Sequence, residues 1–422
     1  MLDHNSEPES SEDSFLGSDD QALSISKPGH LLLGDMDDQE IMSSLAISDG
    51  EPDQECADEQ STDMSHDQII FEDDSCNSFY GHNNNPIYAL AVLKSHVISG
   101  GGDDRCFCWD PSADPPAPIY PKAFSKPKFT DSISAVAISH DAELCAAGCL
   151  SGQVAVWKVS SNGASLLGLF DGPSDITSLQ FHPKGYILMA SGEDGTIWLW
   201  SLPSGNCLTV LSTDSFAILK ASFYPQSGKY VVSSSADGSV RVWDPKSSLP
   251  KSKFSTGSAV NTIDLFESTT DCTKFILAGC EDGRVSLLHG VTCALLKEQC
   301  DLHENSVEIV AFAKRGENLY ALSCCLGGIL AIVEVPSLAL RNQCVHPFGI
   351  TTLKVISNET LFVAVTGSTD GKVRVWDILS GSLLRTLMGH QDTILDLSYI
   401  ASSQQLVSAS DDGCCLVFNL NN

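Results

Sequence analysis

Apolar and polar residues alternate between Val231 and Asp244 with the two-residue period of a β-strand, interrupted once by a turn. The Asp237-Gly238 pair in the interruption is typical of a two-residue hairpin loop, in which glycine adopts positive φ without strain. Closely similar segments occur at 190–200 and 366–377. A single hairpin cannot bury its own apolar face, so we expect the recurring copies to pack against one another.

Two landmarks measure the period of this repeat, and each of them counts eight copies. One is the turn aspartate, present as Asp103, Asp194, Asp237, Asp282, Asp370 and Asp412 and replaced by Ser151 and Gly327. The other is the tryptophan that closes the second strand, present as Trp109, Trp157, Trp200, Trp243 and Trp376 and replaced by Leu288, Val333 and Phe418. Successive copies lie 42 to 48 residues apart, which is close to the length of a four-stranded propeller blade.

These spacings predict an all-β protein, an eight-bladed β-propeller over residues 69–422, preceded by a disordered acidic tail over 1–68. The repeats lie at about 79–110, 129–159, 168–202, 207–244, 252–290, 300–335, 341–378 and 383–420. If each repeat begins with an outer strand, the last blade lacks one. We expect Asn77–Tyr80 to supply that strand, which would leave no open sheet edge in the ring.

A third landmark is a histidine four or five residues ahead of an expected inner strand, at His82, His303, His346 and His390. With the turn aspartate and the closing tryptophan, it resembles the pattern of the WD-repeat family. The resemblance implies that the histidine, a strand Ser or Thr, the aspartate and the tryptophan form a hydrogen-bonded set inside a blade. We interpret these residues as structural, because they recur at the blade period. Copies two, five and six depart most from the pattern and should be held by packing.

Charge is unevenly distributed along the chain. Residues 1–78 contain 22 Asp and Glu and one basic residue, Lys27, which gives −21; the other 344 residues contain 32 acids and 23 bases, which gives −9. Residues 1–68 have too few large apolar side chains to offset the entropy cost of ordering. The acidic balance argues against direct binding to nucleic acid or to a membrane, and favours a basic protein or peptide as the partner.

The sequence contains no recognisable catalytic, cofactor-binding or metal-binding motif, so we expect a protein that is not an enzyme and has no cofactor. The 16 cysteines include no CxxC pair and indicate reduced thiols. No apolar run of 18 residues occurs, and the N-terminus lacks the basic and apolar regions of a signal peptide. These features predict a cytoplasmic protein, with a nuclear pool as an alternative.

Acidic residues stand at two kinds of loop position that should share one face of a propeller. They precede inner strands at Asp131, Asp175, Asp214, Glu304 and Asp392, and they lie in hairpin turns at Glu193, Glu281 and Asp411. We interpret them as a rim that attracts a basic partner, since like charges gathered on one face steer encounter. The alternative is a solvated rim without a partner.

Within the WD-repeat family, the chain most resembles the group of the angio-associated migratory cell protein and its fungal counterpart. The shared features are an acidic tail that ends near residues 71–74, uneven repeats, and the segments 151–159, 181–183, 194–200 and 340–344. This resemblance implies an escort chaperone or assembly factor for a basic protein of the large ribosomal subunit, whose positively charged N-terminal segment is captured on the propeller face. Animal members are linked to cell migration and signalling.

A second hypothesis is a substrate receptor of a cullin-RING ubiquitin ligase, or a signalling scaffold. Residues 231–246 resemble the extended WD box that binds the propeller adaptor of such ligases. The resemblance assigns adaptor contacts to Asp237, Trp243, Asp244 and Lys246, although Lys246 stands where arginine is commoner.

Overall fold

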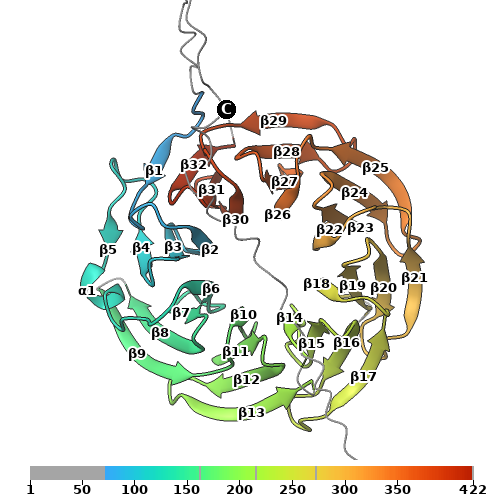
Figure 1. The fold of residues 1–422 in the computed structure, drawn as a ribbon, viewed down its shortest axis with the longest axis horizontal. Helices are drawn as coiled ribbons and strands as arrows, with labels where there is room; N and C mark the ends of the chain where they lie inside the picture. Colours follow the sequence, from blue (N-terminus) through green and yellow to red (C-terminus); the bar gives the residue numbers. More distant parts are fainter. Residues whose placement is uncertain (1–71, 161–162, 214–215, 271–272, 421–422) are drawn as a thin grey trace, which may run out of the picture. The chain divides into compact units, whose positions relative to one another are not determined.

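The computed structural model describes residues 72–160, 163–213, 216–270 and 273–420, and these form a ring of eight four-stranded antiparallel sheets (Figure 1). The prediction of an eight-bladed β-propeller is confirmed. The acidic tail predicted over 1–68 lies outside the described residues, and the boundary at 68 stays a prediction.

The strands of a blade run outward from the ring axis in chain order, except in blade 8, whose outermost strand comes from the start of the described chain (Figure 1). Blade 1 comprises β2 (Ile87–Leu93), β3 (His96–Gly101), β4 (Cys106–Trp109) and β5 (Pro118–Ile119). Blade 2 comprises β6 (Ile133–Ile138), β7 (Leu144–Cys149), β8 (Gln153–Ser160) and β9 (Gly163–Asp171). Blade 3 comprises β10 (Ile176–Phe181), β11 (Ile187–Gly192), β12 (Thr196–Ser201) and β13 (Asn206–Ser212). Blade 4 comprises β14 (Ile218–Phe223), β15 (Val231–Ser235), β16 (Ser239–Trp243) and β17 (Pro250–Ser255).

Blade 5 comprises β18 (Val260–Glu267), β19 (Lys274–Cys280), β20 (Val285–His289) and β21 (Leu295–Gln299). Blade 6 comprises β22 (Val307–Arg315), β23 (Asn318–Cys325), β24 (Ile329–Glu334) and β25 (Ala339–Val345). Blade 7 comprises β26 (Ile350–Ser357), β27 (Phe362–Ser368), β28 (Val373–Asp377) and β29 (Leu383–Leu387). Blade 8 comprises β30 (Ile394–Ile400), β31 (Gln405–Ser410), β32 (Cys415–Asn419) and β1 (Asn77–Phe79).

The two middle strands of a blade are buried because a neighbouring blade covers each face. Every residue of β15 and β16 is buried, whereas the outer strand β17 is largely exposed. The core is therefore divided into clusters between blades, and Val240 of blade 4 packs in one cluster with Ile263 and Ile276 of blade 5. Small and β-branched side chains suit these positions, where two sheets interdigitate.

The hairpin between β15 and β16 has a three-residue loop, so the expectation of a two-residue loop was wrong. Ala236, Asp237 and Gly238 separate the strands, and Gly238 has φ +74°. The N–H of Gly238 donates to the carbonyl oxygen of Ser235 at 3.1 Å. A three-residue loop ends with one residue in the left-handed region, and glycine takes that conformation at little cost.

The expected closing strand is present as β1, which pairs with β32 and completes blade 8 (Figure 1). Asn77 lies opposite Val417 and Phe79 lies opposite Cys415. The Phe79 ring stacks on the indole of Trp109 in blade 1, with centroids 4.7 Å apart and an interplanar angle of 8°. The first and last segments of the ring are therefore joined by backbone pairing and by a buried aromatic contact.

Polar side chains of inner strands link neighbouring blades around the ring axis. Asp396 of blade 8 accepts a hydrogen bond from the N–H of Leu90 in blade 1 at 2.7 Å, and Asp264 of blade 5 accepts one from the N–H of Phe312 in blade 6 at 2.6 Å. An inner strand has no strand on the side that faces the ring axis, so these carboxylates satisfy donors that a ladder would otherwise pair. Burial raises the pKa of Asp396 to about 6 despite these bonds.

The single helix among the described residues, α1 (Pro121–Phe124), has four residues and lies in the connection between blades 1 and 2. No helix in the described part of the chain is long and apolar enough to cross a membrane.

Removal of β1 should open the ring. We expect a chain that lacks residues 1–80 to aggregate and to melt well below the full chain, because deletion exposes the edge of β32 and removes the Phe79–Trp109 contact. The control is deletion of residues 1–68, which should leave the melting temperature nearly unchanged. Thermal unfolding and light scattering of both chains would test this, and equal melting of the two would show that β1 is dispensable.

Candidate partner-binding face

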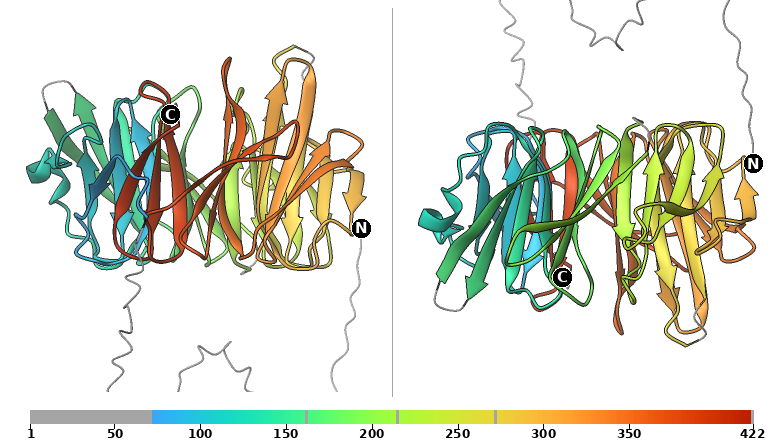
Figure 2. Two further views of the ribbon diagram at one scale, coloured as in Figure 1. Left: turned by 90° about the horizontal axis from the view of Figure 1, so that it is seen from above. Right: turned by 90° about the horizontal axis from the view of Figure 1, so that it is seen from below.

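One backbone hydrogen bond recurs in all eight blades and defines a face of the ring. Its donor precedes the turn-aspartate position between the two middle strands, and its acceptor precedes the inner strand. The pairs, 2.8 to 3.3 Å long, are Gly102 to Pro86, Leu150 to Ser132, Glu193 to Asp175, Ala236 to Ala217, Glu281 to Ala259, Leu326 to Ser306, Thr369 to Gly349 and Asp411 to Thr393. The two kinds of loop therefore lie side by side on one of the two faces seen edge-on in Figure 2, here called the rim face.

The structure places seven of the eight predicted rim acids on this face. Glu193, Glu281, Asp411, Asp175, Glu304 and Asp392 are exposed and Asp131 is half-buried, while Asp214 lies outside the described residues. In blade 8 the acids are close enough to influence one another. Partial burial, together with the charges of Asp392 and Asp412, raises the pKa of Asp411. The rim face thus concentrates negative charge, as solvent-exposed carboxylates on adjacent loops must.

The rim face also carries large apolar side chains, which the charge pattern of the sequence did not indicate. Leu150 and Leu326 occupy the turn position that carries Glu193 in blade 3, and Phe216 and Phe348 stand two residues ahead of inner strands. Leu326, Phe216 and Phe348 are 50%, 53% and 56% exposed. In the sequence, these apolar side chains could have been recognised from leucine at a turn position that is polar or small in the other blades.

Two of these apolar residues, Leu326 and Phe348, and the rim acid Glu304 belong to adjoining loops of blades 6 and 7. The N–H of Leu326 donates to Ser306, two residues beyond Glu304. Gly349, next to Phe348, approaches Leu326 so closely that a Cβ there would lie 2.8 Å from the Leu326 carbonyl oxygen. Glu304, Leu326 and Phe348 therefore combine a carboxylate with two exposed apolar side chains, an arrangement that can hold a cationic and an apolar group of one peptide.

Beneath the rim face, blade 1 contains the complete hydrogen-bonded set implied by the family resemblance. His82 Nδ1 lies 2.7 Å from Asp103 Oδ1, and His82 Nε2 lies 2.9 Å from Ser99 Oγ. Trp109 Nε1 donates to the same Ser99 hydroxyl at 3.3 Å. The set links the loop before the inner strand, both middle strands and their turn, so it holds the rim-face loops in place.

Blade 8 contains the same set without the indole. His390 Nδ1 lies 2.8 Å from Asp412 Oδ2 and His390 Nε2 lies 2.7 Å from Ser408 Oγ, while Phe418 takes the place of tryptophan. Burial acts to raise the pKa of Asp412, but hydrogen bonds led by that from His390 hold it well below its usual range. Cys414 Sγ donates to Asp412 at 3.0 Å. These three side chains include types that bind metals, and hydrogen bonding to one another already accounts for their arrangement.

Blades 6 and 7 contain altered sets. In blade 7, His346 Nε2 and Trp376 Nε1 share the Thr366 hydroxyl, and Arg374 stands between His346 Nδ1 (3.2 Å) and Asp370 (2.6 Å). In blade 6, His303 bonds Ser323 at 2.6 Å, but its Nδ1 has no partner because Gly327 replaces the aspartate. Burial lowers the pKa of His303 to about 4, and burial with the charge of Arg374 does the same for His346.

Blades 2 to 5 lack the histidine, and the turn aspartates of blades 3 to 5 each accept a hydrogen bond from a side chain of their own hairpin. Asp194 accepts from the Thr196 hydroxyl at 2.7 Å, Asp237 from Arg241 at 2.7 Å, and Asp282 from Arg284 at 2.7 Å. Trp243 still donates to a strand serine, Ser233, at 2.9 Å, and Trp200 is buried. Loss of the histidine is thus the departure from the family pattern that blades 2 to 5 share. The substitutions at Ser151, Leu288 and Val333 did not indicate this loss.

Trp157 of blade 2 has a different role. Its Nε1 donates to the carbonyl oxygens of Ala123 and Lys126, each at 3.1 Å, in the connection that follows blade 1. The indole is fully buried, so a partner for its N–H is required. Trp157 therefore fixes that connection against blade 2 instead of closing a set within its own blade.

The four residues of the expected ligase-adaptor box occupy different environments. Asp237 bonds Arg241 and Ser239 inside the hairpin, and Trp243 is buried against Ser233. Lys246 is exposed, and its backbone N–H donates to the side chain of Asp244 at 3.0 Å in the turn that follows β16. Lys246 and Asp244 are thus available to a partner, while Asp237 and Trp243 act within the blade.

Protonation of His303 should weaken the fold. Its folded pKa of about 4 lies below the ordinary 6.5, so between these values the unfolded chain binds a proton that the folded chain excludes. The contribution of neutral His303 to the free energy of unfolding is therefore fully present above about pH 6.5. It decreases by about 1.4 kcal/mol per pH unit as the pH falls toward 4. Denaturant unfolding of the wild type and His303→Gln should therefore diverge by about 2 kcal/mol between pH 6.5 and pH 5. The exposed His289→Gln serves as control, and parallel curves for His303→Gln would contradict the assignment.

Comparisons with known proteins agree with this architecture. The model of the WD domain, G-beta repeat matches residues 124–158, 164–201, 205–244, 340–377 and 381–419. The human angio-associated migratory cell protein is 29% identical over 338 residues, which cover 76% of this chain and 74% of that protein. Among solved structures, Saccharomyces cerevisiae Sqt1 superimposes with a TM-score of 0.73 at 17% identity, covering 83% of this chain and 100% of that chain.

A second Sqt1, from Chaetomium thermophilum, was solved bound to the N-terminus of the ribosomal protein L10. It superimposes with a TM-score of 0.72 at 20% identity and covers 82% of this chain and 100% of its own. The family model thus identifies WD repeats in five segments of the chain, and the solved structures share its propeller fold.

Proposed function

We propose that the rim face binds a basic segment of a partner protein, and that this chain is an escort chaperone or assembly factor for a basic protein of the large ribosomal subunit. The observation that carries the proposal is the hydrogen bond repeated in all eight blades, because it gathers acids from two sets of loops onto one face. Glu304, Leu326 and Phe348 add apolar contact to the charge. The related Sqt1 bound to the N-terminus of ribosomal protein L10 supports the choice of partner.

Charge and apolar contact should contribute differently to such binding. Exposed carboxylates accelerate encounter and contribute affinity that falls as salt is added. Buried aromatic and aliphatic contacts retain their contribution at high salt, because it depends on area removed from water. A basic segment with apolar residues would use both contributions.

Neutralising the rim should weaken capture of a basic peptide. The test uses Glu193→Gln/Glu281→Gln/Asp411→Asn and a synthetic peptide from the N-terminus of ribosomal protein L10. At low salt the variant should bind about tenfold more weakly, from three exposed charges contributing about 0.5 kcal/mol each. The difference should shrink above 0.5 M salt. Fluorescence anisotropy over a salt series would measure both effects.

The matched control removes three exposed acids from the opposite face. Glu143, Glu317 and Glu359 lie in the turns between the inner strand and the next strand of blades 2, 6 and 7. Glu143→Gln/Glu317→Gln/Glu359→Gln changes the net charge equally, so an equal loss of affinity would contradict a localised rim site. Leu326→Ser/Phe348→Ser should reduce affinity at every salt concentration, and failure to do so would remove the apolar part of the proposal.

The ligase-adaptor hypothesis remains an alternative, supported by the exposure of Lys246 and the partial exposure of Asp244 beside β16. Under that hypothesis Lys246→Ala abolishes co-purification with the adaptor and leaves binding of the ribosomal peptide unchanged. Unchanged adaptor association would eliminate this use of the box.

A further inference from the structure

Three lysine side chains converge on the ring of Tyr230, where blades 4 and 5 adjoin. The Nζ atoms of Lys229, Lys251 and Lys274 lie 5.1, 4.8 and 5.9 Å from the centroid of this ring. The turn between β14 and β15 carries Lys229 and Tyr230. Lys251 lies at the start of β17 and Lys274 at the start of β19. These strand ends are remote from the rim-face loops, so the four residues, here called the lysine cluster, lie on the opposite face.

The hydroxyl group of Tyr230 holds two of these ammonium groups at one place. Lys251 Nζ donates a hydrogen bond to Tyr230 Oη at 3.0 Å. Hydrogen bonds from Lys251 and Lys229 lower the pKa of Tyr230, against the opposing effect of burial. Because like charges repel, two ammonium groups held at one oxygen are stabilised when an anion binds between them. The arrangement is therefore suited to a carboxylate or another oxyanion.

Glu267 is the carboxylate that the structure places in contact with the lysine cluster, and it neutralises Lys274. Its Oε1 lies 2.6 Å from Lys274 Nζ, and its Oε2 accepts two backbone N–H groups of the β14–β15 turn at 2.8 and 3.1 Å. Asp271, four residues beyond Glu267, lies outside the described residues. Within the described part of the chain, Lys229 and Lys251 form no ion pair. These two ammonium groups can therefore bind an external anion.

The tyrosine rings beneath the ammonium groups are fixed. Tyr224 and Tyr230 are buried in the apolar cluster between blades 4 and 5, and the Tyr224 hydroxyl donates to the carbonyl oxygen of Gly290. The ammonium groups stay accessible, because Lys229 and Lys251 are exposed. Binding therefore orders two lysine side chains and requires little other reorganisation of the protein.

Exposed residues beside the lysine cluster add an apolar side chain and further positive charge. Lys246 and Leu249 lie in the connection between β16 and β17 that leads to Lys251, and Leu249 is 70% exposed. The acid of this connection, Asp244, is half-buried and accepts the backbone N–H of Lys246 at 3.0 Å. An acidic peptide can supply both a carboxylate for the lysines and an aliphatic side chain for Leu249.

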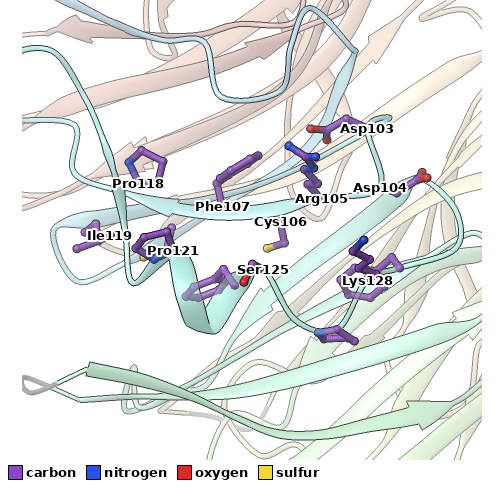
Figure 3. A pocket seen from close by; sticks show the side chains of 14 residues that line it. Asp103, Asp104, Arg105, Cys106, Phe107, Pro118, Ile119, Pro121, Ser125 and Lys128 are labelled. Atoms are coloured by element: carbon purple, nitrogen blue, oxygen red, sulfur yellow. The ribbon is translucent and has the colours of Figure 1, made fainter.

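The local surplus of positive charge stands out in a chain that carries −30. The pocket of about 500 Å³ beside β4 (Figure 3) shows the contrast, because its lining contains Asp103 and Asp104 as well as Arg105 and Lys128. At the lysine cluster, three lysines face one described carboxylate. Repulsion by the rest of the chain disfavours long polyanions such as nucleic acid, whereas a short acidic segment interacts mainly with the nearest charges.

We propose that the lysine cluster binds an acidic peptide segment of a partner protein. Carboxylates of the segment contact Lys229 and Lys251, and an apolar side chain packs on Leu249. The site lies on the face opposite to the rim face, so an acidic and a basic partner can bind the same molecule together. This inference does not depend on the function proposed for the rim face.

The first test measures binding of a ten-residue peptide of six Glu, two Leu and two Gly, labelled with a neutral dye, at 0.15 M salt, where the Debye length is about 8 Å. We expect saturable binding, and replacement of Glu by Gln should weaken it about tenfold. Replacement of both Leu by Ser should weaken it at every salt concentration. Absence of binding at 1 mM peptide, or equal binding of the Gln peptide, would overturn the proposal. Stronger competition by an oligouridylate of equal length would also overturn it, in favour of a nucleic acid.

The second test locates the site on the protein. Lys229→Glu/Lys251→Glu should bind the acidic peptide about tenfold more weakly, and both positions are exposed, so the fold should persist. The control, Lys122→Glu/Lys158→Glu, changes the net charge equally at exposed positions in α1 and blade 2 and should bind normally. An equal loss of affinity in the two variants would contradict a localised site.

A milder variant tests the arrangement of the lysines. Tyr230→Phe keeps the buried ring and removes the hydroxyl that gathers Lys229 and Lys251. We expect it to weaken binding of the acidic peptide several-fold at an unchanged melting temperature, because the two ammonium groups are no longer held together. Unchanged affinity would contradict that role for Tyr230. Neither lysine-cluster variant should alter binding of the basic ribosomal peptide, and loss of both peptides would show that the two faces are not separate.

Discussion

No blade of this ring can bury both of its faces alone, so each depends on the blades at its two sides. The middle strands are largely buried, and the clusters that bury them combine residues of adjacent blades. The stabilising free energy of packing between sheets is proportional to the apolar area removed from water. It does not require the same hydrogen-bonded polar residues in every blade. This explains how four blades without the histidine keep the same architecture. The hydrogen-bonded sets of blades 1 and 8 then specify local geometry at the loops.

The fold was predictable because its evidence is periodic. A turn aspartate and a strand tryptophan recur at the blade interval, and Asn77–Tyr80 stood where a closing strand was needed. The length of the hairpin loop was not predictable at that level, since Asp237-Gly238 suits both two-residue and three-residue loops. The pairing of Arg374 with His346 and Asp370 was also missed, because a strand arginine usually points to solvent.

The sequence could reveal only part of the candidate partner-binding face. Acids such as Glu193 and Asp411 could be assigned to a common face, because strand alternation dictates which loops lie together. The apolar contact proposed for Phe348 and Leu326 depends on the exposure of their side chains, which the amino-acid composition does not give. The shortness of β5, whose pairing with β4 stops at Cys108, was also not predictable, because no motif marks it. Trp157 matches the family landmark in sequence, yet its indole N–H donates to carbonyl oxygens in the connection between blades 1 and 2.

The pairing of β1 with β32 also constrains the order in which the protein can assemble. Asn77 and Val417 are partners although 340 residues separate them in the chain (417 minus 77). At roughly 5–20 residues per second of synthesis, β1 waits on the order of 17 to 70 seconds before β32 exists. Closing a chain of that length in one step would cost about 5 kcal/mol of loop entropy, whereas blades that stack in succession bring the two ends together beforehand. Throughout synthesis β1 is therefore a strand without its partner, and this interval is when the chain itself most needs protection from aggregation.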